Sequence, residues 1–247
     1  MLEFKNIPAW QQRAALLLKP ENLKRLQESH VLVVGIGGVG AYTAEQLCRA
    51  GVGKITIVDG DDIENTNRNR QLPALVSTEG RSKVEVMAER LRDINPEAEI
   101  IALHRFLKDE ATDEVLANGY DYVVDAIDTL SPKVNLIAKC VKLGYPLVSS
   151  MGSGGKLDPT KIEIKDVSKS YKCPLAKAIR KRLHRQGIYK GFKVVFSPED
   201  APEHAVYAYE EDETGKCGSV VGTVSYMPPI FGCCCASVVI RELACNF

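Results

Sequence analysis

The chain lacks an excess of charge of either sign and lacks a long apolar run. Lys and Arg together number 32, and so do Asp and Glu. Any attraction to a polyanion must therefore come from local clusters of basic residues rather than from bulk charge. No apolar run approaches the roughly 20 residues of a membrane span, and the most apolar tail segment, residues 230–240, is shorter. The N-terminus lacks the basic-then-apolar pattern of a signal peptide. We therefore expect a cytoplasmic protein with no membrane span.

Closely spaced cysteine pairs are missing as well. None of the eight cysteines forms the C-x-x-C spacing with which a zinc ribbon binds its ion. The consecutive Cys233, Cys234 and Cys235 would point in different directions on a helix or a strand, which makes a poor metal site. We expect no structural zinc and interpret the three as buried small apolar residues. A reactive thiol among them, or at Cys217, stays open.

Short β-branched runs alternate with amphipathic stretches over the first 152 residues. Strands are expected at 30–35, 54–59, 98–104, 120–127 and 145–152, and helices at 41–51, 82–96 and 132–144. Strands that alternate with helices of this length predict an α/β fold, a Rossmann-like, doubly wound and mostly parallel sheet covered on both faces. After about residue 160 we expect a basic helix, a strand pair and a Gly/Pro-rich tail. Residues 1–160 would form the core, with an N-terminal helical arm, and residues 161–247 an extension of the same domain.

A glycine loop lies between the first expected strand and the first helix of the core. The run V-V-G-I-G-G-V-G-A places Gly35, Gly37 and Gly40 in the pattern G-x-G-x-x-G, with Gly38 between them. Such a loop allows a phosphate to approach the amides of a helix N-terminus. Asp59, about 20 residues further on, ends the next strand, where a carboxylate can bind a ribose. The alternative is a tight packing turn that binds nothing.

The segment after Asp59 distinguishes between kinds of nucleotide. Residues 57–71 read I-V-D-G-D-D-I-E-N-T-N-R-N-R-Q. A nicotinamide dinucleotide needs the acid that binds its ribose but no arginine cluster. A triphosphate that releases pyrophosphate needs cations that stabilise the charge of the leaving group. Arg70 and either Asn67 or Asn69 suit that role, and Lys83 adds a cation. Asp128, after the strand Y-V-V-D-A-I, offers a carboxylate to a divalent ion shared with phosphates. Arg68 is interpreted as a solvated charge.

These motifs, in this order, resemble the ubiquitin-activating-enzyme-like (ThiF/MoeB-type) adenylating superfamily. The set comprises G-I-G-G-V-G, V-D-x-D, N-x-x-R-Q, a lysine that opens a helix, and D-A-I-D at residues 125–128. The resemblance implies an adenylating core that uses ATP and Mg²⁺. Asp59 would hold the ribose, Arg70 and Lys83 the phosphates, and Asp128 the magnesium. The remaining nucleotide-binding residues would be Gly35, Gly37, Gly38, Gly40, Asp61, Asn67, Asn69 and Gln71.

The N-terminal arm is similar to one branch of this superfamily. Its segment R-A-A-L-L-L-K-P-E-N-L resembles the opening R-T-x-L-L-L-G-x-E-x-L, with Ala14 and Lys19 in place of the usual Thr and Gly. The resemblance implies a homodimer in which Arg13 reaches the active site of the partner subunit. The alternative is that Arg13 is an ordinary charge on a helix surface.

A basic segment follows residue 173. As a helix over about 174–186, it would turn Leu175, Ile179 and Leu183 inward and display a basic stripe. The candidate tRNA-binding residues are Lys177, Arg180, Lys181, Arg182, Arg185 and Lys190. A solvated face is the alternative. The P-L-A-x-x-x-R-x-x-L pattern and the following V-x-S-x-E resemble the tRNA threonylcarbamoyladenosine dehydratase branch, whose usual Asp before Pro-Leu is Cys173 here.

This branch implies a reaction. The carboxylate of N6-threonylcarbamoyladenosine in tRNA would be adenylated by ATP, and the ureido nitrogen would then close on the carbonyl to give a cyclic hydantoin. Two alternatives remain. One is adenylation of the C-terminal glycine of a ubiquitin-like sulfur carrier. The activators of such carriers typically hold a zinc ion with two C-x-x-C pairs, so the absence of these pairs and the presence of the basic segment count against this alternative. The other is a non-catalytic RNA-binding subunit. The partners expected are tRNA and a second copy of the chain, but not DNA. A cysteine desulfurase or other sulfur-transfer partner stays open.

Overall fold

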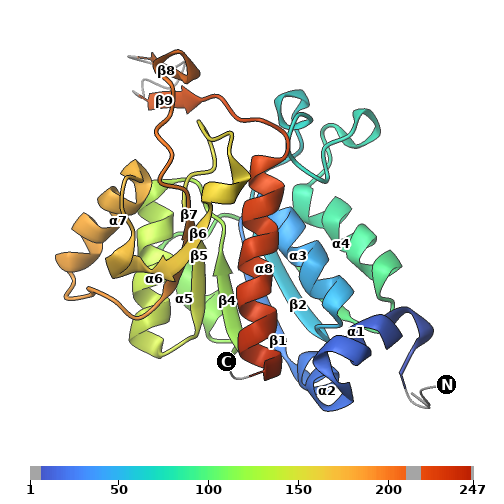
Figure 1. Ribbon diagram of the computed structural model, residues 1–247. Coiled ribbons are helices and arrows are strands. Elements are labelled where there is room, and N and C mark those ends of the chain that lie inside the picture. Colours follow the sequence, from blue (N-terminus) through green and yellow to red (C-terminus); the bar gives the residue numbers. More distant parts are fainter. Residues whose placement is uncertain (1–6, 210–217, 246–247) are drawn as a thin grey trace.

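The computed structural model describes residues 7–209 and 218–245 and is built around one seven-stranded sheet (Figure 1). The strand order is β3-β2-β1-β4-β5-β7-β6, and every pairing is parallel except that of β6 with β7. The strands are β1 (His30–Val34), β2 (Lys54–Asp59), β3 (Glu99–His104), β4 (Tyr122–Asp125), β5 (Leu147–Ser150), β6 (Glu163–Asp166) and β7 (Lys193–Phe196). The mostly parallel α/β sheet predicted from the sequence is confirmed.

Helices cover both faces of this sheet. One face packs against α1 (Gln12–Leu18), α2 (Pro20–Glu28), α3 (Gly40–Ala50), α4 (Lys83–Ile94) and α8 (Met227–Cys245). The other packs against α5 (Asp109–Leu116), α6 (Leu130–Leu143) and α7 (Pro174–His184). Val31 and Val33 of β1 belong to the first core and Leu32 and Val34 to the second, because successive side chains of a strand point to opposite faces.

The helix α8 corrects the expectation of an irregular Gly/Pro-rich tail. It runs along one face of the sheet (Figure 1) and packs on α3, where the Thr43 hydroxyl donates to the Gly232 carbonyl (3.1 Å). By length and composition its residues Met227–Ala244 could cross a membrane, and half of that window is buried inside the protein. Phe231, Cys235 and Val239 are among the residues that α8 buries in the core. The helix therefore forms part of the sheet's cover, whereas β6 and β7, which also follow residue 160, are strands of the sheet itself.

The order of the strands creates a switch point beside β1. The chain leaves β1 through α3 toward β2 on one side and returns through β3 to β4 on the other. Ligands of doubly wound sheets bind in the crevice outside the carboxyl ends of the strands at such a point. The glycine loop after β1 and the D-A-I-D turn after β4 both lie there, since the Ala126 amide donates to the Val34 carbonyl (2.8 Å).

A separate hairpin stands beyond this edge of the sheet (Figure 1). It pairs β8 (Val206–Tyr209) with β9 (Gly218–Val221) in antiparallel register. Its base is fixed by two backbone hydrogen bonds, from Gly222 to Ala205 (2.7 Å) and from Gly155 to Gly222 (2.8 Å). The hairpin base is thereby fixed to the loop that follows β5.

Candidate active site

The glycine loop is compact at two positions and open at a third. Gly35 has φ +87°, and a Cβ there would lie 2.7 Å from the Ala126 carbonyl oxygen. A Cβ at Gly40 would lie 1.7 Å from the Gly35 carbonyl oxygen. A Cβ at Gly37 would meet only the Gln71 amide, at 3.8 Å. Glycine is thus required at 35 and 40 for packing, whereas the space in front of Gly37 can admit a phosphate.

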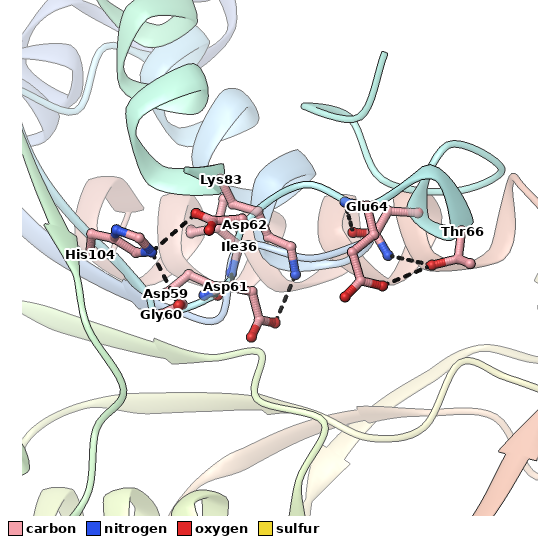
Figure 2. Close-up of polar contacts among 10 residues, drawn as sticks. Ile36, Asp59, Gly60, Asp61, Asp62, Glu64, Thr66, Lys83 and His104 are labelled. Carbon is pink, nitrogen blue, oxygen red and sulfur yellow. Dashed lines mark hydrogen bonds and ion pairs between the residues drawn. The ribbon is translucent and has the colours of Figure 1, made fainter. Parts of the chain in front are cut away.

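Asp59 connects this loop to the end of β2. Its Oδ2 accepts a hydrogen bond from the Ile36 amide (2.6 Å), and its Oδ1 accepts one from the Asp61 amide (2.9 Å) (Figure 2). Burial raises the pKa of this carboxyl group, and the two amides oppose the rise. A carboxylate has about four acceptor sites, so capacity remains for ribose hydroxyls after these two bonds. The structure thus shows what places Asp59, and its contact with a ribose stays a prediction.

Lys83, the first residue of α4, is held at the same edge. Its side chain is buried, and its Nζ lies 2.8 Å from Oδ2 of the exposed Asp61 (Figure 2). His104 supports the intervening turn, since its Nε2 lies 3.1 Å from the Gly60 carbonyl oxygen. Asp61 thus positions a cation next to the end of β2, and its own contact with the nucleotide stays a prediction.

The Asn/Arg segment forms a short loop around a 3₁₀ turn, Asn65–Asn67. Asn67 is buried, and its Oδ1 accepts from the Glu64 amide (3.2 Å), which stabilises the start of that turn. Arg70 donates through Nη1 to the Thr66 carbonyl (3.0 Å) and to Asn69 Oδ1 (2.7 Å). Arg68 is exposed, consistent with the solvated charge expected of it.

Gln71 and α8 complete this side of the site. The Gln71 Oε1 is buried and has no hydrogen-bond partner among residues 7–209 and 218–245. A buried acceptor without a donor is costly. The Gln71 atom nearest to the open space at Gly37 is the donor Nε2, which suits a phosphate oxygen bound there. The start of α8 packs on the same glycine loop, because Pro228 lies 2.9 Å from the position that a Cβ on Gly38 would occupy. No local pattern of the sequence indicated this contribution of α8.

The D-A-I-D turn contains a buried ion pair that sequence reasoning missed. Asp125 and Lys133 are fully buried, with Oδ2 and Nζ 2.8 Å apart. Ser149 donates to Asp125 (2.6 Å), and Lys133 donates to the Ile127 carbonyl (2.8 Å). Burial raises the pKa of Asp125, and the Lys133 ammonium opposes the rise. Asp128, three residues later, is exposed. Its carboxylate can therefore bind a ligand at the switch point, whereas the Asp125 carboxylate is already paired inside the protein.

Arg13 lies away from the glycine loop of its own chain. It is exposed on α1, two residues after Gln11. The Gln11 side chain is packed against Gly51, the residue that ends α3, because a Cβ there would lie 2.2 Å from Gln11 Nε2. The glycine loop is at the opposite end of α3. An eleven-residue helix is roughly 16 Å long, so this placement leaves Arg13 free to act on another subunit.

The basic helix forms as α7, with its apolar side toward the core. Ala176, Ile179 and Leu183 are buried, and Leu175 is half-buried and packs against the same core, as expected. Arg180 donates to the Ser170 hydroxyl and Arg182 to the Ser131 hydroxyl (2.8 Å). Four other basic side chains of this segment are exposed and make no hydrogen bond or ion pair with other described residues: Lys177, Lys181, Arg185 and Lys190. The basic stripe thus contains two arginines that bind the protein and four cations that face solvent.

Cys173 occupies the N-cap position of α7. Its side chain is buried and makes no capping hydrogen bond. An Asp at this position could cap the helix, whereas Cys173 contributes apolar contact instead. In the cysteine triple, Cys235 is buried, Cys234 half-buried and Cys233 exposed, and burial raises the pKa of all three thiols. Cys217 lies outside the described residues. Within the described ranges no three His, Cys, Asp or Glu side chains are grouped to hold a metal ion.

This site sits on a fold with characterised relatives. A model of the ThiF family matches residues 11–245. The chain belongs to the ThiF family. It is 48% identical over 187 residues to the tRNA threonylcarbamoyladenosine dehydratase of Bacillus subtilis, covering 76% of this chain and 74% of that protein. The Escherichia coli protein of the same name is 38% identical, covering 95% of this chain and 94% of its own length.

Solved structures give the same placement within the ThiF family. The crystal structure of the E. coli tRNA N6-threonylcarbamoyladenosine dehydratase in complex with ATP superposes with a TM-score of 0.87 at 36% identity, covering 97% of both chains. The same enzyme in complex with AMP superposes with a TM-score of 0.86. The chain therefore falls in the dehydratase branch of the ThiF family, as the motifs of its sequence indicated.

Proposed function

We propose that this chain catalyses the ATP-dependent dehydration of N6-threonylcarbamoyladenosine in tRNA to the cyclic hydantoin form. The observation that carries the proposal is that these groups all follow the carboxyl ends of adjacent parallel strands: the open glycine loop after β1, Lys83 and the Arg70 loop after β2, and the exposed Asp128 after β4. These groups provide for binding a triphosphate and stabilising the pyrophosphate that leaves. The names of the bacterial relatives supply the substrate.

The residues divide the work of adenylation. Asp59 would bind the ribose, and the loop amides near Gly37 would bind phosphate oxygens. Arg70 and Lys83 would stabilise the charge that develops on pyrophosphate as the substrate carboxylate attacks the α-phosphate. The ureido nitrogen then forms a bond to the activated carbonyl and loses its proton, and AMP leaves with the bonding electron pair. Ring closure is intramolecular, so proximity favours it.

Magnesium fits the donor set at this edge. Mg²⁺ is commonly held by one or two carboxylates together with substrate phosphates, and Asp128 is an exposed carboxylate at the switch point. When bound, the ion would neutralise part of the phosphate charge. We propose no zinc site. We also propose that residues 161–247 extend the ATP-binding core as one domain, and that the enzyme works in the cytoplasm, where its tRNA would be.

The alternative activity of the same core is adenylation of a ubiquitin-like sulfur carrier. The two are separated by pyrophosphate release from purified protein with either bulk tRNA or a carrier protein ending in glycine. We expect release with tRNA and little with the carrier. Release with the carrier alone would reverse the assignment.

Arg13 provides a prediction about assembly. If it acts across a homodimer, mixing an Arg13→Ala chain with an Asp128→Ala chain should restore part of the activity, because some heterodimers then contain one complete site. Pyrophosphate release from co-expressed, doubly tagged heterodimers measures this. Heterodimers without any rescue would place Arg13 outside the partner's site. Mixing two differently tagged Asp128→Ala chains is the control.

The exposed cations of α7 provide a prediction about tRNA. Reversing Lys177, Lys181 and Arg185 to Glu should weaken tRNA binding by about tenfold or more and flatten its salt dependence, because phosphate contacts release counterions. ATP affinity should not change. These three residues are preferable to Arg180 and Arg182, whose side chains bind serines of the protein.

The matched control carries the same charge change on other helices and loops. Exposed lysines suitable for it are Lys24, Lys108 and Lys142. Filter binding across a salt series measures both variants. Equal losses in the two would show that the effect is one of net charge, and unchanged binding in the α7 variant would make its stripe a solvated face.

A further inference from the structure

Asn69 uses both ends of its side-chain amide within the protein. Its Oδ1 accepts from Arg70 Nη1 (2.7 Å), and its Nδ2 donates to the Thr223 carbonyl (3.0 Å). Thr223 lies between β9 and α8. The Thr223 carbonyl fixes the orientation of the amide, because the opposite orientation would place an NH₂ group against the guanidinium and an oxygen against a carbonyl oxygen.

This contact determines which edge of Arg70 is available. A guanidinium has five N–H donors in a fixed plane, two of them on Nη1. Both Nη1 hydrogens are used, by Thr66 and by Asn69. Within residues 7–209 and 218–245 neither Nε nor Nη2 of Arg70 donates to the protein. The edge formed by Nε and Nη2 can therefore bind two oxygens of one phosphate side by side.

The Thr223 carbonyl is itself placed by the base of the hairpin. The preceding residue, Gly222, is bonded to Ala205 and to Gly155, so it joins the β8–β9 hairpin to the loop after β5. Asn69 consequently connects the loop that carries Arg70 to a part of the chain more than 150 residues away. A side chain that only capped its own loop would not need this second contact.

We propose that Asn69 is a positioning residue: it holds Arg70 with its Nε–Nη2 edge toward the triphosphate and takes its own orientation from the base of the β8–β9 hairpin. This inference rests on the proposed function, since it takes Arg70 to bind a phosphate of ATP. It replaces the expectation that Asn69 binds the nucleotide directly. Asn69 acts through Arg70, and its loss should matter only while Arg70 is present.

The test is a double-mutant cycle on ATP affinity, measured by calorimetry with magnesium on the full-length chain. Asn69→Ala should weaken ATP binding by about tenfold, the scale of one hydrogen bond to a charged group. In an Arg70→Ala background the same substitution should have no further effect. The matched control is Asn65→Ala, because Asn65 is an exposed amide of the same loop that bonds Glu79 and not Arg70. Thermal unfolding should be the same for all four variants.

Three results would overturn the inference. Wild-type ATP affinity in Asn69→Ala would remove its role in positioning. An equal loss in the presence and absence of Arg70 would make Asn69 a direct ligand. An Arg70→Ala variant that binds ATP like the wild type would refute the phosphate-binding role of Arg70 and, with it, this inference. The readout is ATP binding and does not involve tRNA. If tRNA proved not to be the substrate, these results would therefore still test the role of Asn69.

Discussion

Arg70→Ala, Lys83→Ala and Asp128→Ala should each slow adenylation by about a hundredfold or more, the scale of losing one preorganised group that stabilises transition-state charge. Arg70 and Lys83 have their cationic groups fixed by neighbouring acceptors, at 2.7 Å from Asn69 and 2.8 Å from Asp61. Positions fixed before ATP binds need no reorganisation during the reaction. Pyrophosphate release at saturating tRNA measures the loss.

The control for these variants is Arg68→Ala. Arg68 belongs to the same loop and carries the same charge, but it is exposed and donates no side-chain hydrogen bond within the described part of the chain. Its removal should leave the rate nearly unchanged, and circular dichroism should show all four variants folded. If Arg70→Ala, Lys83→Ala and Asp128→Ala each released pyrophosphate at nearly the wild-type rate, the assignment of the triphosphate site would be contradicted.

Lys133→Met should lower the free energy of unfolding by about 3–5 kcal/mol, because it leaves a buried carboxylate without its counter-ion. Asp125 would keep hydrogen bonds from Ser149 and from the Ile127 amide, which do not neutralise its charge. Burial already raises the pKa of Asp125, and loss of the ammonium should raise it further. The deficit should therefore shrink as pH falls toward the ordinary range of a carboxyl group, where Asp125 becomes neutral.

A second variant separates charge from packing. Asp125→Asn combined with Lys133→Met removes both charges and should be more stable than Lys133→Met alone. Urea denaturation at neutral and acidic pH measures both. A double variant less stable than the single one, or a deficit that does not change with pH, would show that Lys133 contributes by packing rather than by charge.

The sequence predicted the parts of the fold that depend on local pattern. β2 was predicted over 54–59 and has those bounds, because β-branched residues end at the acidic turn. The end of α8 that touches the glycine loop was missed, since Pro228, Pro229 and Gly232 are typical of irregular segments. The prolines lie in the first turn of the helix, where amides have no helical partner. Gly232 lets α8 approach α3, since a Cβ there would lie 2.5 Å from the Val39 carbonyl oxygen.

The site was predictable where its residues follow a motif and not where they depend on distant contacts. The glycine loop, Asp59, Lys83 and Asp128 lie at strand or helix ends, which the parallel-sheet pattern brings to one edge. Lys133 is one of three lysines in α6, and its pairing with Asp125 depends on the packing of α6 against β4. The contact of Asn69 with Thr223 spans the chain, so no local pattern could indicate it.

The most direct test of the proposed function measures the tRNA product. The purified chain would be incubated with magnesium, ATP and tRNA that contains N6-threonylcarbamoyladenosine, and the nucleosides would then be analysed by mass spectrometry. We predict that the modified nucleoside loses the mass of one water, with AMP and pyrophosphate formed in step, and that Arg70→Ala abolishes the change. An unchanged nucleoside in the presence of active, ATP-binding protein would contradict the dehydratase assignment.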